Sequence, residues 1–259
     1  MNQRPNILII NPDQMRADAL HHLGNEASFT PNLDDLGFDG VSFKNAFCQN
    51  PVCVPSRCSF MTGLYPHTKG HRTMSYLLHE DEGNLFSDMK EAGYYTVSST
   101  RGDLMAGQLR KYHRYLIDKY LMFSHVKTPA TVVKSGRGEK GSDTFFSFFD
   151  GIIPEHKKGR EIKNIDDLCI DSAIRQIKKR PKKKPFFMFV GLNFPHPPYQ
   201  IEEKYYNMID ETKLQQRIPN IEDSDGKPLM EKGLMEALGI SEWSEERLRE
   251  KAYISCYVC

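Results

Sequence analysis

The sequence has no long apolar run, and this excludes a membrane-spanning helix. Such a helix needs about 18 consecutive apolar residues, and no segment of the 259-residue chain reaches that length. The chain also has little excess charge, because 35 lysines and arginines face 34 aspartates and glutamates. A net charge of +1 gives no general reason to expect a nucleic acid or an anionic membrane as partner.

A secretory signal and a disordered composition are also missing. Residues 1–5 lead directly into the apolar segment 6–10, which is too short for a signal-peptide core and lacks a small-residue cleavage site. We therefore expect a cytoplasmic protein whose six cysteines are mostly thiols. The 15 phenylalanines and 12 tyrosines can fill a hydrophobic core, and we expect one domain over residues 1–259.

Apolar runs alternate with helical patterns along the chain. The predicted strands are 6–10, 41–43, 94–97 and 186–192, and the predicted helices are 56–61, 85–92, 165–179, 242–257 and one that follows Thr30. Two of these strands are continuous apolar runs, which is typical of fully buried parallel strands. A helix followed by an apolar strand occurs twice, which predicts an α/β fold with a mostly parallel central sheet flanked by helices.

Local signals refine this prediction. Thr30 suits the N-cap position of the next helix and Pro31 its first turn. We expect Gly37 and Gly40 to break that helix. Residues 101–160 have a mixed composition, for which we expect mostly loop and helix.

Polar residues follow two of the predicted strands. Asp13 and Gln14 come after segment 6–10, and His196 comes after segment 186–192. In open α/β sheets, ligands bind at the carboxyl ends of the strands. Taken alone, such an aspartate is more often a turn or cap residue, and a histidine among prolines is more often a loop residue.

The most specific pattern lies in residues 53–66. Residues 53–57 read Cys-Val-Pro-Ser-Arg, and residues 62–66 read Thr-Gly-Leu-Tyr-Pro. This pattern resembles the signature of the sulfatases, a family of the alkaline-phosphatase superfamily whose cysteine is oxidised after translation to formylglycine. The resemblance implies an α/β sulfatase-like fold, Cys53 as the precursor of the nucleophile, and a formylglycine-generating maturation enzyme as partner.

The chemistry of an aldehyde explains why the family modifies this cysteine. A hydrated aldehyde offers one hydroxyl that attacks sulfur or phosphorus, and a second whose deprotonation expels the bound sulfate. An unmodified thiol cannot perform that second step. By the same resemblance, Arg57 would stabilise the oxyanion of the nucleophile. Without the surrounding motif, Cys53 would be interpreted as a buried structural thiol.

Two other segments resemble the same family. The strand 6–10 with the residues after it matches the N-terminal metal-binding segment, which implies Asp13, Gln14 and Cys53 as ligands. Oxygen ligands favour a hard divalent cation over zinc, so we expect Ca²⁺, with Mg²⁺ or Mn²⁺ as alternatives. Residues 194–199 match a Pro-His-x-Pro segment, in which His196 would contact the transferred group or protonate the leaving oxygen.

The sequence departs from the family pattern in two places. Residues 100–104 read Thr-Arg-Gly-Asp-Leu where most sulfatases carry a Gly-Lys-Trp-His segment. Arg101 then stands at the lysine position and can bind a sulfate oxygen, whereas Asp103 stands at the histidine position with a different charge. The later segment that supplies two further metal ligands is not present before residue 259. We therefore expect an N-terminal portion of a sulfatase.

The resemblance implies hydrolysis of a sulfate ester of a small molecule or carbohydrate. A phosphonate or phosphate ester hydrolase of the same superfamily and an inactive, truncated sulfatase-like protein stay open as alternatives. A zinc or redox site at Cys256 and Cys259 would need a second Cys-x-x-Cys pair, which the sequence lacks. The basic run 178–184 is interpreted as a solvated helix end rather than as a nucleic-acid site.

Overall fold

The structure of the protein is a computed structural model. It describes residues 4–79, 81–100, 115–122, 149–153, 156–157, 160–161, 163–196 and 199–214, and positions 233, 236–237, 239, 243–244 and 246. The chain divides into two compact units. The first contains residues 1–14, 45–129 and 163–193, and the second contains residues 15–44, 130–162 and 194–259.

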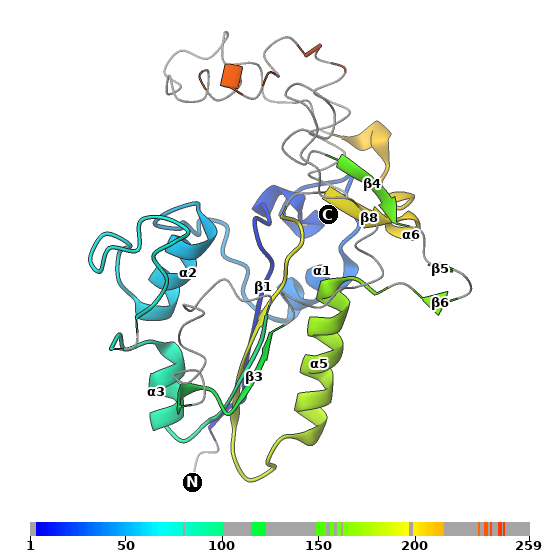
Figure 1. Ribbon diagram of the computed structural model, residues 1–259. Coiled ribbons are helices and arrows are strands. Elements are labelled where there is room, and N and C mark those ends of the chain that lie inside the picture. The colour runs from blue at the N-terminus through cyan, green and yellow to red at the C-terminus, as the bar shows by residue number, and fades with distance from the viewer. Residues whose placement is uncertain are drawn as a thin grey trace. The chain divides into compact units, whose positions relative to one another are not determined.

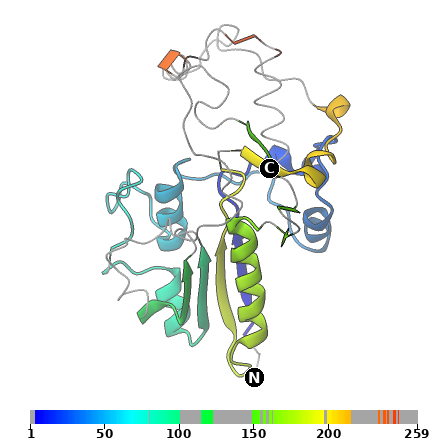
Figure 2. The same cartoon turned by 45° about the vertical axis from the view of Figure 1, so that its right-hand side comes forward.

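The first unit is built on a four-stranded sheet in which every neighbouring pair of strands is parallel (Figures 1 and 2). The strands in spatial order are β1 (Ile7–Asn11), β7 (Phe186–Gly191), β2 (Tyr95–Thr100) and β3 (Lys119–Met122). The predicted α/β fold with a parallel sheet is therefore confirmed. The apolar strand β7 lies inside the sheet and is buried at every position, as its continuous apolar sequence predicts.

Helices cover both faces of this sheet (Figure 1). The helix α5 (Ile165–Lys179) packs on one face, whereas α2 (Cys53–Thr62) and α3 (Leu85–Glu91) lie on the other. The bounds predicted for α5 are confirmed at both ends. The helix α2 begins three residues before the predicted start, at the cysteine of the signature itself.

Alternate side chains of β7 supply two separate cores. Phe187 and Phe189 pack with residues of α2 and α3, while Met188 and Val190 pack with residues of α5. The period of two follows from the pleat of a strand, which sends successive side chains to opposite faces. The sheet is therefore held from both sides, and its carboxyl edge is fixed relative to the start of α2.

Capping residues define where these helices begin or end. Asn84 before α3 and Asn164 before α5 each form a capping box, in which the asparagine side chain accepts backbone N–H groups of the first turn. Gly63 ends α2 in the left-handed conformation (φ 71°), which glycine adopts without steric cost. The predicted stop of this helix at Gly63 is confirmed.

Two predictions for the first unit are wrong. Segment 6–10 was expected to be fully buried, but Leu8 and Ile10 of β1 are 45% and 58% exposed. The reason is that β1 is the edge strand of the described sheet and these two side chains lie beyond the cover of α5. Within segment 101–160, expected as loop and helix, β3 is a strand. Its charged first residue and its length of four residues gave no strand signal.

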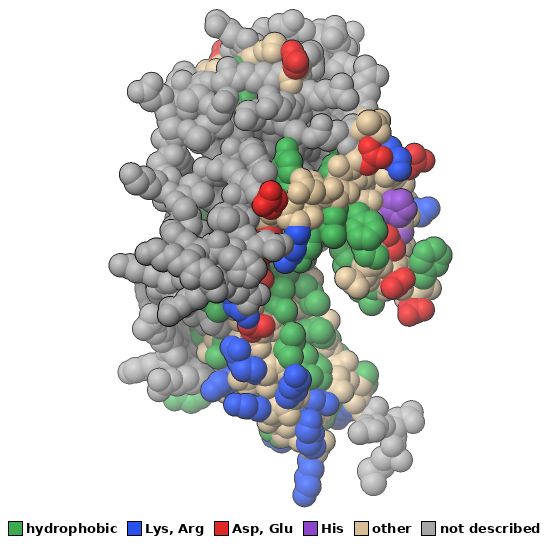
Figure 3. Space-filling model, turned by 90° about the vertical axis from the view of Figure 1, so that its right-hand side faces the viewer, with side chains coloured by type: hydrophobic (Ala, Val, Ile, Leu, Met, Phe, Trp, Pro, Cys, Tyr) green, Lys and Arg blue, Asp and Glu red, His purple; other side chains and the backbone are tan. Residues whose placement is uncertain are grey.

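The surface at the end of α5 is basic. Lys178 and Lys179 in its last turn and the lysines at 182–184 are exposed, and Figure 3 shows Lys and Arg side chains gathered where α5 leads into β7. Cations at this position complement the negative end of the helix dipole. Within the described residues, no helix combines the length and the apolar character that crossing a membrane requires.

The second unit contains shorter elements. They are the 3₁₀ turns η1 (Ala17–Ala19), η2 (His21–Leu23) and η5 (Glu211–Lys213), the helices α1 (Pro31–Asp39) and α6 (Glu203–Tyr206), the parallel pair β4 (Phe149–Ile153) and β8 (Tyr199–Glu202), and the hairpin of β5 (His156–Lys157) and β6 (Arg160–Glu161). The strands in 149–161 again differ from the loop and helix that we expected there.

Two expectations for residues 30–43 are corrected. Thr30 and Pro31 do stand at the predicted start of α1, but the helix continues through Gly37 and stops only at Gly40. Gly37 lies close to the His22 ring: a Cβ atom there would be 3.1 Å from two of its ring atoms, which is a tight contact. Residues 41–43, predicted as a strand, have no regular structure. The predicted helix 242–257 lies almost wholly outside the described residues.

Candidate active site

Cys53 is the first residue of α2, and its side chain is partly buried. The preceding Val52 is extended and provides no side-chain cap, and the first turn carries no acidic residue. The positive end of the helix dipole at residue 53 is therefore not compensated by a carboxylate of its own first turn. A negative charge that forms on residue 53 is stabilised at this position.

The environment distinguishes Cys53 from the other described cysteines. Cys58, on the same helix, is fully buried; burial raises the pKa of its thiol to about 12, and the charge of Glu82 adds to the rise. Burial in the same way raises the pKa of Cys169 in α5 to about 12. Both stay neutral thiols at physiological pH. Cys53 combines access to solvent with a place at a helix start, whereas Cys48 is exposed in an irregular segment.

A buried ion pair ties α2 to the carboxyl end of β1. The guanidinium Nη2 of Arg57 donates to Oδ2 of Asp13 at 3.1 Å, and the two side chains are only 3% and 8% exposed. Arg57 is four residues after Cys53, so both lie on the same side of the helix. The structure thus places Cys53, Arg57 and Asp13, three of the predicted site residues, around one helix start. Their catalytic roles remain predictions.

Gln14 adopts a strained backbone conformation directly after Asp13. Its φ of 63° is the one positive value among the described residues other than glycine, and a glutamine in this region costs about 1 kcal/mol or more. The turn leaves the Gln14 side chain exposed. Strain of this kind is typical of functional sites, and nothing in the sequence indicated it.

The donor atoms of Asp13 and Gln14 fit part of a site for a hard divalent cation. One carboxylate and one amide oxygen are the ligand types that Ca²⁺ and Mg²⁺ prefer. Two side chains are too few for the six to eight oxygens around Ca²⁺. Within the described residues, no group of three or more His, Cys, Asp or Glu side chains has the arrangement of a metal site.

Arg101 and His196 are the remaining predicted site residues. Arg101, together with Asp103, lies outside the described residues. His196 is described and partly buried, and it belongs to the second unit. In the first unit, the chain just before it is anchored by the backbone N–H of Asn193, which donates to Oδ1 of Asp166 in α5 at 2.7 Å.

Met74 is a contact of Cys53 that the sequence did not indicate. The Cys53 Sγ donates a hydrogen bond to the Met74 Sδ at 2.9 Å. Met74 lies in an irregular segment without helical or strand periodicity, and no motif points to it. Only the folded path of the chain brings it to the start of α2.

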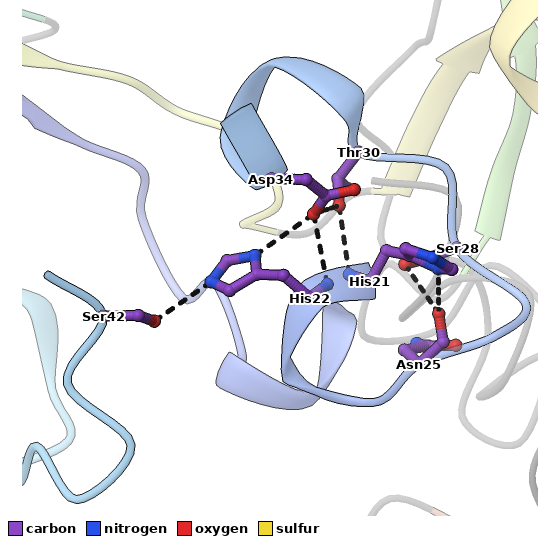
Figure 4. Close-up of polar contacts among 7 residues, drawn as sticks. All are labelled: His21, His22, Asn25, Ser28, Thr30, Asp34 and Ser42. Carbon is purple, nitrogen blue, oxygen red and sulfur yellow. Dashed lines mark hydrogen bonds and ion pairs between the residues drawn. The ribbon is translucent and has the colours of Figure 1, made fainter. Parts of the chain in front are cut away.

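A second cluster of polar side chains lies in the second unit, between η2 and α1 (Figure 4). The residues are His21, His22, Asn25, Ser28, Thr30, Asp34 and Ser42. The Oδ1 atom of Asp34 accepts from the His22 backbone N–H at 3.1 Å and from the Thr30 hydroxyl at 2.9 Å, and it lies 3.1 Å from His22 Nδ1. On its other side, the His22 ring is 3.0 Å from the Ser42 hydroxyl.

These contacts join η2 to α1. The order Ser42, His22, Asp34 is also that of a serine-hydrolase triad. The Asp34 oxygen, however, is shared among three donors from residues within 12 positions of it. Burial alone would raise the pKa of Asp34, but the hydrogen bonds from Thr30 and His22 outweigh it and lower the pKa. We interpret the cluster as structural, because its hydrogen bonds hold α1 against η2.

Comparisons with known proteins agree with the geometry. The sequence model of the Sulfatase family matches residues 5–257. The chain is 28% identical over 241 residues to an arylsulfatase of Clostridium perfringens, covering 82% of this chain and 47% of that protein. It is 25% identical over 226 residues to an N-acetylglucosamine-6-O-sulfatase of Bacteroides thetaiotaomicron, covering 87% and 37%. The chain thus spans half or less of the length of these relatives.

A solved structure gives the same fold. The phosphonate monoester hydrolase of Agrobacterium radiobacter superposes on 98% of this chain and 56% of its own, with a TM-score of 0.65 and 20% sequence identity. At this identity the likeness concerns the fold alone. The parallel sheet with helices on both faces is therefore the core of a known architecture.

Proposed function

Because the chain belongs to the sulfatase family, we propose that the protein containing it hydrolyses a sulfate ester, with Cys53 as the precursor of the nucleophile. The observation that carries this proposal is the position of Cys53 at the start of α2, four residues before the buried Arg57 that binds Asp13. A thiol placed for structure alone would resemble Cys58, buried within the same helix and neutral.

The residues of this chain prepare the site for negative charge. Oxidation of Cys53 to formylglycine would supply a hydrated aldehyde. One of its hydroxyls would attack sulfur while the S–O bond to the alcohol breaks and the alcohol leaves with a proton. Deprotonation of the other hydroxyl would then break the C–O bond to the bound sulfate, release it and restore the aldehyde. Arg57 and the N-terminal end of α2 place positive charge near residue 53. Asp13 fixes the guanidinium of Arg57 in one orientation, so little reorganisation is needed when the anionic ester arrives.

Asp13 and Gln14 are proposed to hold a divalent cation, for which Ca²⁺ is our first choice and Mg²⁺ or Mn²⁺ the alternatives. The cation would supply positive charge to the sulfate oxygens and the nucleophile. Further oxygen ligands must come from other parts of the protein. Arg101 as a sulfate-binding cation and His196 as a contact of the leaving oxygen complete the proposed machinery.

The proposed substrate is a sulfated carbohydrate or a sulfated small molecule. One relative is named for the 6-O-sulfate of N-acetylglucosamine and another for aryl sulfates, which supports both classes. The proposed partner is a formylglycine-generating enzyme that recognises the segment around Pro55 and Arg57. The second candidate is hydrolysis of a phosphonate or phosphate ester. It is favoured by Asp103, which stands where most sulfatases carry a histidine.

The test is turnover by the whole protein, produced together with a formylglycine-generating enzyme. We expect faster hydrolysis of an aryl sulfate than of an aryl phosphonate, and loss of turnover in Cys53→Ala. Cys48→Ala is the matched control, because it removes an exposed thiol outside the helices and should retain the wild-type rate. Preference for the phosphonate would favour the second candidate, and turnover that survives Cys53→Ala would contradict both.

A further inference from the structure

Met74 covers the sulfur atom of Cys53. The two sulfur atoms are 2.9 Å apart, and the Met74 side chain is 47% exposed, so one side of it rests on Cys53 and the other faces solvent. A thioether is a weak acceptor and an adaptable apolar surface. A molecule that brings a sulfate group to residue 53 therefore has this side chain as a neighbour.

The segment that carries Met74 is closed by a buried pair of side chains. The Nε2 atom of His71 lies 3.0 Å from the carboxyl group of Glu82, and its Nδ1 lies 2.7 Å from the backbone oxygen of Tyr76. His71 and Glu82 are only 3% and 8% exposed. A carbonyl oxygen can only accept, so Nδ1 donates to it, and a hydrogen bond joins Nε2 to the carboxyl group.

Further contacts dock this segment on α2. The Oε2 atom of Glu82, which lies 3.0 Å from His71 Nε2, also accepts the backbone N–H of His79 at 2.8 Å, and the rings of His71 and His79 are 6.0 Å apart. The Tyr76 carbonyl also lies 4.0 Å from the Sγ of Cys58 in α2. Leu78, almost fully buried, adds an apolar anchor. A buried polar pair with all these partners specifies one loop conformation.

We propose that Met74 is a specificity-determining residue that contacts the organic part of the substrate beside the transferred group, and that His71 and Glu82 are the positioning residues that hold it there. This inference rests on the proposed role of residue 53. An apolar thioether next to the nucleophile favours an aryl ring or the C–H face of a sugar over a second anionic group. The loop that carries Met74 thereby selects the leaving group, whereas Arg57 and Asp13 prepare the site for the sulfate group.

The test measures how fast iodoacetamide alkylates Cys53 in protein made without the maturation enzyme, with the label at each cysteine located and quantified from fragment ions by mass spectrometry, because Cys48 and Cys53 share one tryptic peptide. This readout does not depend on sulfatase activity, so it can fail separately from the proposed function. We expect Met74→Ala to accelerate alkylation of Cys53 about tenfold, because it removes the bulk of the side chain that covers the sulfur atom. Met74→Leu keeps the bulk and should stay near the wild-type rate.

The positioning role is tested with His71→Gln and Glu82→Gln. We expect both to accelerate alkylation of Cys53 as Met74→Ala does, while the buried Cys58 stays protected. His67→Ala is the matched control, because His67 is an exposed histidine of the preceding turn whose ring stacks on Tyr65. Its Cys53 rate should equal that of the wild type. The exposed Cys48 gives the reference rate within each sample.

Each other outcome overturns part of the inference. An unchanged Cys53 rate in Met74→Ala would show that Met74 does not cover the sulfur. Acceleration in Met74→Ala without acceleration in the His71 and Glu82 variants would remove the positioning role. Simultaneous labelling of Cys58 in both of those variants would show that the pair stabilises the whole unit instead. In the matured whole protein, Met74→Ala should raise KM for an aryl sulfate several-fold with kcat nearly unchanged, and an unchanged KM would refute the specificity role.

Discussion

Two aspartates of the protein lie at the same distance from a nitrogen atom of a side chain, which belongs to an arginine in one pair and to a histidine in the other. The surroundings of the two pairs differ. The Asp13–Arg57 pair and the Asp34–His22 pair both have a separation of 3.1 Å. The first joins residues 44 positions apart and is buried to 3% and 8% exposure. The second joins residues 12 positions apart and is 15% and 16% exposed.

The difference shows that distance alone does not identify a functional site. The Asp34 oxygen is shared among local donors, and these contacts are explained by the need to hold α1 on η2. The Asp13–Arg57 pair lies at the carboxyl end of a parallel strand, beside a strained Gln14 and on the helix of the signature cysteine. Burying both charges of the Asp13–Arg57 pair costs desolvation free energy. A contact that only holds two segments together would not require this cost.

The largest expected effect is on catalysis. In the matured whole protein, Arg57→Met should lower the turnover of an aryl sulfate by about 10²–10³-fold, because a preorganised positive charge next to residue 53 is lost. Asp34→Asn should change the turnover per folded molecule by less than about twofold. Initial rates, corrected for the folded fraction by circular dichroism, decide the comparison. Equal losses in both variants would remove the distinction between the two pairs.

The next effect is on stability. Arg57→Met leaves Asp13 as a buried carboxylate without its cation, and we expect the free energy of unfolding to fall by about 3–5 kcal/mol. The double variant Asp13→Asn/Arg57→Met removes both charges and should regain most of this loss while staying inactive. Urea denaturation measures both variants. A double variant that is no more stable than Arg57→Met would show that the ion pair is not the source of the loss.

A smaller effect is expected at Asp34. Asp34→Asn weakens the hydrogen bonds that hold α1 against η2, and we expect the free energy of unfolding to fall by roughly 1–2 kcal/mol. The pKa of Asp34 is lowered from its ordinary value of 3.8, so the contribution of the ionised group is fully present above that value and is lost as the pH falls through the folded pKa. The stability difference between wild type and Asp34→Asn should therefore be constant near neutral pH and shrink below about pH 4. A difference that grows on acidification would contradict this sign.

The smallest effect concerns Gly37 within α1. In an open helix, Gly→Ala stabilises by about 1 kcal/mol, but here the new Cβ would lie 3.1 Å from the His22 ring. Because contacts to Asp34 and Ser42 hold that ring on both sides, we expect Gly37→Ala to give less than this gain. In a His22→Ala background the full gain should return. A double-mutant cycle of unfolding free energies measures the coupling, and no coupling would mean that the ring moves freely.

Much of the fold followed from local patterns. The bounds of α5 and the buried course of β7 were predictable because an amphipathic helix and a continuous apolar run each have a distinct periodicity. The exposure of Leu8 and Ile10 was not, because it depends on which strand lies at the sheet edge. The strand β3 was missed, since four residues carry too little pattern.

In the candidate site, only residues that belong to a sequence motif or follow a strand were predictable. The segment with Cys53 and Arg57 was recognisable as a string, and Asp13 was recognisable by its place after a strand. Their ion pair, the backbone strain at Gln14 and the cover by Met74 arise from contacts between distant segments. No periodicity in one sequence encodes such contacts.

The most direct test is the fragment-ion mass spectrum of the tryptic peptide 45–57, from whole protein matured by a formylglycine-generating enzyme, because this peptide contains both Cys48 and Cys53 and its fragments distinguish them. We predict replacement of one sulfur and two hydrogen atoms by one oxygen at Cys53, with Cys48 and Cys58 unchanged. We also predict that the aryl sulfatase rate rises in proportion to the converted fraction. A peptide that keeps the Cys53 thiol in fully active protein would contradict the central claim.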